Sequence, residues 1–205
     1  MEMLQMIVLL IAAFLLGSCP FSFLVGKKII RKDIRDYGDG NPGAINVFRA
    51  GGSRAGCVAV FLDVSKGIPF VHIAYATYNL SGIAIAAISL SVIAGNAFSP
   101  FLHFKGGKSI AVTFGTLIGM IPQVELLVLF IIFILVGVFF FSNNAWTVIT
   151  APTGSLIYLQ VTAAPYWQTV FVAAVLILLA IKHRHELKNK PRVKLRVLEW
   201  IRSSI

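Results

Sequence analysis

The chain has 205 residues, of which 58% are apolar and only 13% are charged, and its formal net charge is +10. Soluble domains hold about 25% charged residues, so this composition, with a mean hydropathy of +0.86, excludes an ordinary soluble protein. The positive charge does not indicate a nucleic-acid partner, because it lies in segments between long apolar runs.

Apolar runs that approach the roughly 20 residues needed to cross a bilayer occur along most of the chain. The predicted fold class is an all-α integral membrane protein, one polytopic domain over residues 1–205. Pro122 follows a short fourth run, so the alternative is one kinked helix over 109–141 and six spans in total. The main prediction is seven spans, at residues 3–25, 57–78, 82–102, 109–121, 125–141, 146–163 and 166–182.

The Lys and Arg residues form three clusters: seven in 27–54, two in 103–108 and eight in 182–205. With seven spans, all three clusters face one side, which the positive-inside rule makes cytoplasmic. We therefore expect cytoplasmic loops at 26–56 and 103–109, a cytoplasmic tail at 183–205 and an external N-terminus. The tail either binds anionic headgroups or only fixes orientation. The first run lacks a basic leading segment and predicts an anchor, not a cleaved signal.

The first basic loop has the residues of an anion site. Glycines let backbone N–H groups converge, amides donate hydrogen bonds, and a guanidinium presents a fork to phosphate. A tight turn with solvated charges is the alternative interpretation. The residues concerned are Gly38, Gly40, Asn41, Gly43, Asn46 and Arg49.

Asp63 and Lys66 lie inside the second predicted span, where an ionisable residue is costly unless it is paired. Their spacing of three places them on one helix face and predicts an ion pair. The pair either orients the helix or holds Lys66 for a substrate.

The loop 103–109 reads His-Phe-Lys-Gly-Gly-Lys-Ser. Gly106 and Gly107 let the backbone fold around an oxyanion, which Lys108 can neutralise. If the next helix starts at Ser109, its N-terminus also favours a phosphate. The motif is weak alone, and its glycine spacing is not that of a P-loop.

His183, Arg184 and His185 close the last predicted span. His183 is a candidate general base or phosphate donor. The alternative is an ordinary helix-end residue.

In order and spacing, these motifs resemble the bacterial acyl-phosphate:glycerol-3-phosphate acyltransferases of the PlsY type. The resemblance covers most of the chain. It includes residues 17–21, 33–35, 38–46 with Arg49, 63–67, 101–108 and 183–184.

The resemblance implies a seven-helix fold in the bacterial plasma membrane, with the active site at its cytoplasmic surface. The family's reaction moves a fatty acyl group from acyl phosphate to the sn-1 hydroxyl of glycerol 3-phosphate, giving lysophosphatidic acid and phosphate for phospholipid synthesis. No metal or organic cofactor is implied. An enzyme that produces acyl phosphate is an expected transient partner.

By the same resemblance, Arg49 and Lys108 contact phosphate groups of the acceptor or donor, His183 orients or deprotonates the acceptor, and the loop with Asn41 and Asn46 shapes the pocket. The residues themselves make Asp39 a second catalytic candidate and add Gly43, Gly106, Gly107, Ser109 and Lys66 to the expected substrate- and phosphate-binding set.

Four positions depart from the family pattern, and the Thr-Arg and Ser residues expected around the sixth span have no clear match in residues 150–155. Asp39 replaces a serine, Asn96 a histidine, Ser109 a glycine and Glu186 an asparagine. An anionic Asp39 would repel the phosphate that the family's serine is thought to bind. Asp39 can instead bond a hydroxyl, act as a base or pair with Arg49. Burial of Asp39 or of Glu186 would raise the pKa of its carboxyl group and favour the neutral form.

Two alternatives follow. The first is a divergent relative that acylates another polyol phosphate or has no turnover. The second is a small anion transporter, which is disfavoured because the sequence shows no internal repeat and the polar motifs gather on one predicted face.

Overall fold

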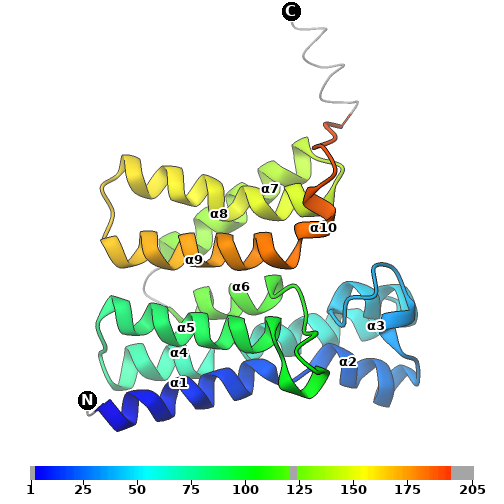
Figure 1. Ribbon diagram of the computed structural model, residues 1–205, viewed down its shortest axis with the longest axis horizontal. Helices are drawn as coiled ribbons and strands as arrows, with labels where there is room; N and C mark the ends of the chain where they lie inside the picture. Colours follow the sequence, from blue (N-terminus) through cyan, green and yellow to red (C-terminus); the bar gives the residue numbers. More distant parts are fainter. Residues whose placement is uncertain (1–2, 121–123, 195–205) are drawn as a thin grey trace, which may run out of the picture. The chain divides into compact units, whose positions relative to one another are not determined.

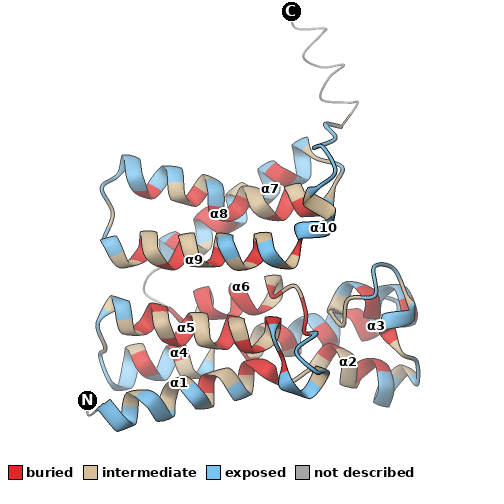
Figure 2. Ribbon diagram, viewed as in Figure 1, coloured by how far each residue is buried: buried red, intermediate tan, exposed pale blue. Residues whose placement is uncertain are grey.

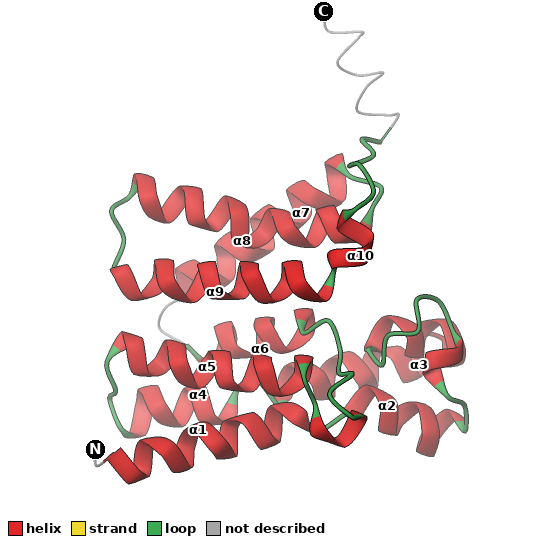
Figure 3. Cartoon of the chain, viewed as in Figure 1, coloured by secondary structure: helices red, strands yellow, loops and turns green. Residues whose placement is uncertain are grey.

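The computed structural model describes residues 3–120 and 124–194 (Figure 1). Every regular element in these two stretches is helical, apart from an isolated bridge between Phe141 and Val193 (Figure 3). The chain divides into two compact units, Met1–Gln123 and Val124–Ile205, and each is described by itself. Pro122 and the end of the basic tail lie outside the described residues.

The first unit holds most of the predicted polar motifs. Its elements are α1 (Met3–Ser18), α2 (Phe21–Val25), η1 (Gly26–Ile30), η2 (Ile34–Asp36), α3 (Ala44–Ser65), α4 (Pro69–His72), η3 (Ile73–Thr77), α5 (Gly82–Ala97), η4 (Pro100–Leu102) and α6 (Ile110–Gly119).

The helices α1 and α5 lie side by side in this unit (Figure 1). Gly95 allows the close approach, because a Cβ there would collide with the carbonyl oxygen of Phe14. The Ser91 hydroxyl donates to Leu10 O at 2.7 Å and adds a polar bond between the helices. The helix α3 packs against α2 and α6.

Large apolar side chains remain exposed on many helices, among them Leu4, Phe61, Phe139 and Val161. Figure 2 marks exposed residues of every kind in pale blue. Three helical runs in the described part of the chain are long and apolar enough to cross a membrane: Met3–Ile30, Ala44–Thr77 and Gly82–Leu102. The integral membrane class is therefore supported, while seven spans and their orientation stay predictions.

The predicted fourth span is short in the structure. Helix α6 has 10 residues, and at about 1.5 Å per residue it covers only half of a hydrocarbon core of about 30 Å. Among the described residues it ends at Gly119, and α7 begins at Val124.

The expected loop at 26–56 is shorter than predicted, because α3 already begins at Ala44. This helix is interrupted at Gly52, whose φ of 75° and ψ of −171° are not helical. A positive φ of this size favours glycine. The residues before the break form a separate helical segment, which carries Asn46 and Arg49.

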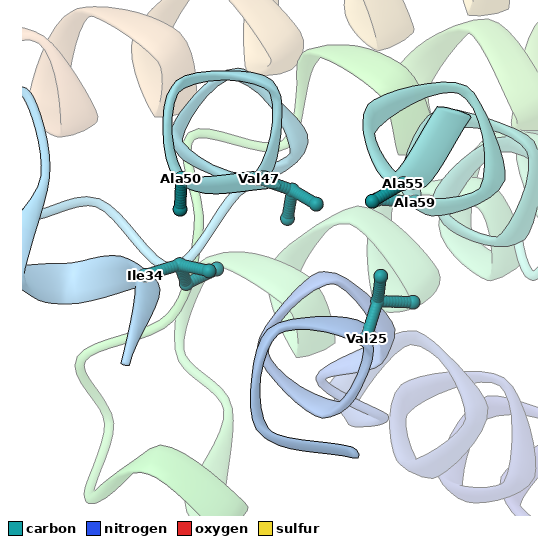
Figure 4. Packing of buried hydrophobic residues seen from close by; sticks show 6 residues of the cluster. All are labelled: Val25, Ile34, Val47, Ala50, Ala55 and Ala59. Atoms are coloured by element: carbon teal, nitrogen blue, oxygen red, sulfur yellow. The ribbon is translucent and has the colours of Figure 1, made fainter. Parts of the chain in front are cut away.

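A small apolar core fixes this segment (Figure 4). Val47 and Ala50 of α3 pack against Ile34 of η2, and Val25 of α2 faces Ala55 and Ala59 across the same core. Because Ile34 and Val47 are fully buried, the start of α3 cannot shift without opening this core.

The second unit contains α7 (Val124–Phe140), α8 (Asn144–Val161), α9 (Tyr166–Lys182) and α10 (Arg184–Leu187). Helix α8 packs against both α7 and α9. The Thr150 hydroxyl donates to Phe133 O at 2.9 Å between α7 and α8, and the side chain of Asn143 caps α8 by accepting from Ala145 N–H at 3.0 Å.

Candidate active site

Residues from two loops and the start of α3 form a surface cluster, which we define as Asp39, Asn41, Asn46, Arg49 and Lys108. Lys108 Nζ lies 2.7 Å from Asp39 Oδ2. Asn46 Nδ2 donates to Asp39 Oδ1 at 2.8 Å and to Asn41 O at 2.9 Å. The structure thus brings together residues 69 positions apart.

Arg49 joins the surface cluster through Asn46, to whose Oδ1 its guanidinium donates at 3.1 Å. Gly38 makes room for this arrangement. It has a φ of 61°, and a Cβ there would collide with the guanidinium. Among the described residues, Asp39 forms its ion pair with Lys108 and not with Arg49, the partner that the sequence suggested.

The Asp39 carboxylate is ionised at neutral pH. Burial raises its pKa, but hydrogen bonds from Lys108, the Asn41 N–H and Asn46 together lower the pKa to about 2. A neutral, protonated Asp39 is therefore disfavoured, because the side chain is 40% exposed and receives several hydrogen bonds.

The loop 103–109 is present as predicted, but the following helix begins at Ile110 instead of Ser109. Ser109 precedes it with a φ of 63° and does not cap it with its side chain. Its hydroxyl instead donates to Ile93 O at 3.1 Å. Gly106 and Gly107 are buried against α5 and fix the path of the loop to Lys108.

The predicted pair of Asp63 and Lys66 is confirmed, with Lys66 Nζ 3.0 Å from Asp63 Oδ1. Both residues are buried at the end of α3. The Ser22 hydroxyl donates to Asp63 Oδ2 at 2.5 Å, and Lys66 also donates to Asn96 Oδ1 at 2.7 Å. Asn96 in turn donates to Ser109 Oγ at 2.9 Å. We call Ser22, Asp63, Lys66, Asn96 and Ser109 the buried cluster.

Asn96 and Ser22 are members of the buried cluster that the predicted site did not include. The available signal was polarity, because each lies in an otherwise apolar run, where a polar side chain needs a partner. The sequence alone does not reveal that their partners are the ion pair and the loop.

His183 lies in the second unit, at the junction of α9 and α10. It is only 2% exposed, and its Nδ1 lies 3.4 Å from Glu186 Oε2. Because α10 starts directly after His183, the two side chains come onto one helical turn. The carboxylate can hold the imidazole in one orientation and stabilise its protonated form.

The helices and the surface cluster define a membrane protein with a cationic site suited to an anionic substrate. A family model described as glycerol-3-phosphate acyltransferase matches residues 7–190. The chain belongs to this family, which confirms the resemblance read from its motifs and establishes an acyltransferase.

Individual relatives agree with this assignment. The glycerol-3-phosphate acyltransferase of Lactococcus lactis subsp. lactis is 32% identical over 193 residues, covering 91% of this chain and 90% of the relative. The enzyme of the same name from Staphylococcus aureus (strain bovine RF122 / ET3-1) is 31% identical over 210 residues, covering 97% of this chain and 100% of the relative.

The fold also resembles crystal structures of PlsY, an integral membrane glycerol 3-phosphate acyltransferase. Its glycerol 3-phosphate form has a TM-score of 0.76 and 27% identity, covering 95% of this chain and 98% of that one. Its lysophosphatidic acid form has a TM-score of 0.77 and 28% identity, covering 90% of each chain.

Proposed function

We propose that this acyltransferase moves a fatty acyl group from an acyl phosphate to the sn-1 hydroxyl of glycerol 3-phosphate, releasing phosphate and lysophosphatidic acid. The observation that carries the proposal is the surface cluster, in which Lys108 and Asn46 donate to one carboxylate and Arg49 donates to Asn46. The crystal forms of PlsY with glycerol 3-phosphate and lysophosphatidic acid support the acceptor and the product.

The surface cluster is suited to a phosphate because its donors already bind an anion. Asp39 receives hydrogen bonds from Lys108 and Asn46. A phosphate dianion carries more charge and more acceptor oxygens than a carboxylate, so it competes with Asp39 for Lys108. Arg49 adds a guanidinium that can bind two phosphate oxygens. The loop at Asn41 and Gly43 then shapes the pocket.

The reaction needs no covalent enzyme nucleophile, because the phosphate of a mixed anhydride is a good leaving group. The acceptor hydroxyl oxygen attacks the acyl carbonyl carbon, and the bond from that carbon to the phosphate oxygen breaks. The phosphate leaves with the electron pair, which the cations stabilise. By the family resemblance the hydroxyl proton passes to His183, a residue of the second unit whose Nδ1 lies 3.4 Å from Glu186 Oε2.

Asp39 has a different role in this proposal. A carboxylate with a pKa of about 2 is a weak base, since general bases work best near the operating pH. It instead accepts a hydrogen bond from an acceptor hydroxyl while Lys108 turns to the phosphate. Asp39 thereby contributes to the choice of acceptor.

The remaining proposals concern the membrane around the enzyme and a partner enzyme. The exposed apolar helix faces suit a bilayer that also holds the acyl chain, and the basic loops suit the cytoplasmic face of a bacterial plasma membrane. An acyl phosphate hydrolyses readily in water, so transient contact with the enzyme that produces it would limit its loss.

The test is lysophosphatidate formation by purified protein from palmitoyl phosphate and labelled glycerol 3-phosphate, with palmitoyl-CoA in parallel. Product from palmitoyl phosphate alone supports the proposal. Product from palmitoyl-CoA alone contradicts the donor. If folded protein makes no product while PlsY does, other polyol phosphates are tried as acceptors, and turnover of one of them establishes the divergent alternative.

Arg49→Ala and Lys108→Ala test the surface cluster within the same assay. Each substitution removes one preorganised cation, so we expect each to cost at least about 2 kcal/mol of transition-state stabilisation, measured from kcat/KM. Lys105→Ala is the matched control, because Lys105 is an exposed lysine of the same loop. Near-normal rates in both cluster variants would remove the proposed anion site.

A further inference from the structure

Asn96, near the end of α5, holds the loop that carries Lys108 at two points. Its backbone carbonyl accepts from Gly107 N–H at 2.9 Å. Its side chain Nδ2 donates to Ser109 Oγ at 2.9 Å. These bonds lie immediately before and after Lys108, so one residue fixes the backbone on both sides of the lysine.

The orientation of the Asn96 amide is set from the protein interior. Lys66 Nζ donates to Asn96 Oδ1 at 2.7 Å. An ammonium group has only donors, so the amide must turn its oxygen toward Lys66 and its NH₂ group toward Ser109. Lys66 is itself held by Asp63 at 3.0 Å and by the carbonyl oxygen of Cys19 at 2.8 Å.

The loop approaches α5 so closely that a side chain does not fit between them. A Cβ on Gly106 would collide with the carbonyl oxygen of Asn96. The Ser109 hydroxyl, having accepted from Asn96, donates onward to Ile93 O. The position of Lys108 is therefore determined by a continuous set of part-buried and buried hydrogen bonds, not by the surface loop alone.

We propose that Asn96 is a positioning residue: it is oriented by Lys66 and fixes the loop so that Lys108 meets the phosphate group of glycerol 3-phosphate. The inference rests on the proposed function, in which Lys108 binds that phosphate. It also gives the buried pair of Asp63 and Lys66 a task in the active site. That task is distinct from orienting α3 and does not require Lys66 to touch substrate.

Three variants separate this role from simple support of the fold. Asn96→Ala removes both side-chain hydrogen bonds. Asn96→His keeps one donor and one acceptor, since a neutral imidazole has one of each. Ser91→Ala is the matched control, because Ser91 is also on α5 and its hydroxyl also bonds across to another segment, at Leu10 of α1.

Two readouts are measured on folded, purified protein. The first is KM for glycerol 3-phosphate beside kcat, because a displaced phosphate ligand raises KM, whereas a loss of folded protein lowers only the apparent kcat. The second is amide hydrogen exchange over residues 103–109, which needs no activity. It reports directly on the bond from Gly107 N–H to Asn96 O.

We expect Asn96→Ala to raise KM roughly tenfold or more, within the ~10²-fold range that a 1 Å displacement can produce, and to speed exchange in the loop. Asn96→His restores both readouts in part, and Ser91→Ala changes neither. If the Asn96→Ala protein folds but matches Ser91→Ala in both KM and amide exchange, the proposal is overturned.

If Asn96→Ala does not fold, Ser109→Ala carries the same test, because it removes only the hydroxyl that accepts from Asn96. We then expect Ser109→Ala to raise KM and to speed exchange in the loop. If it instead matches Ser91→Ala in both readouts, the proposal is overturned. A wild-type enzyme without turnover contradicts the proposed function instead, and the exchange comparison still decides whether Asn96 orders the loop.

Discussion

The carboxylate of Asp39 already occupies the donors of the surface cluster, so a substrate phosphate must compete with it for Lys108. Lys108 and Asn46 both donate to its carboxylate. A phosphate that takes Lys108 must first displace this contact, so part of its binding free energy is offset by the lost ion pair. The family's serine at this position would leave no such competitor.

We therefore expect Asp39→Ser to lower KM for glycerol 3-phosphate, by severalfold, because exposed ion pairs are worth up to about 1 kcal/mol. Steady-state kinetics with glycerol 3-phosphate as the varied substrate measure the change. Asp36→Ser, a substitution of an exposed aspartate in the preceding turn, is the control. An increase in KM would mean that Asp39 binds the acceptor more than it competes with it.

The pH dependence of this residue has a definite sign. Asp39 has a folded-state pKa of about 2, below its ordinary value of 3.8, so its ionisation stabilises the fold above about pH 4. That contribution is lost as the pH falls from about 4 toward 2. The difference in unfolding free energy between wild type and Asp39→Asn should be constant from pH 8 to 5 and shrink below pH 4. Thermal unfolding in detergent measures it, and a change centred near pH 6 would refute the assignment.

At the scale of the helices, the pair of Asp63 and Lys66 couples the end of α3 to α2 and α5 through Ser22 and Asn96. Removing one charge leaves the other buried without its counter-ion. Asp63→Ala should therefore destabilise the protein by about 3–5 kcal/mol. The double substitution Asp63→Leu with Lys66→Met should cost less, because no charge is left behind. Unfolding midpoints and folded yield test this order, and an equal loss in both variants would argue against a charge effect.

The positions of most helices were predictable from the sequence. Hydropathy located most of the helices to within a few residues, because apolar runs and intervening polar segments differ so strongly. The start of α3 was missed, since Gly51-Gly52 disfavours helix locally and hid the helical segment before the break. The spacing of three between Asp63 and Lys66 was enough to predict their contact, because helical periodicity alone brings them together.

Contacts between distant segments were a different matter. The sequence indicated that Asp39 needed a partner but not that the partner would be Lys108, because that depends on how two loops meet in three dimensions. Asn96 was noted only as a departure from the family pattern, and its role emerged from the packing of the 103–109 loop on α5.

For the whole molecule, we expect the N-terminus outside the bilayer and the loop 103–109 inside, because the basic segments favour the cytoplasm. Single cysteines introduced at Gln5 and Lys105, after replacement of Cys19 and Cys57, should react with a membrane-impermeant thiol reagent from opposite sides. Labelling of both from the same side would contradict the seven-span arrangement.

The spacing of the buried charges also bears on how the chain is made. Asp63 meets Lys66 within one helical turn, whereas the other partners of Lys66 and Asp63 lie 30 to 47 positions away. Lys66 is synthesised before Asn96, so during translation it can be neutralised only from its own helix or from the chain before it. The predicted span 57–78 can thus enter lipid with no net charge, and the connection that later positions Lys108 forms once the following helices have been inserted.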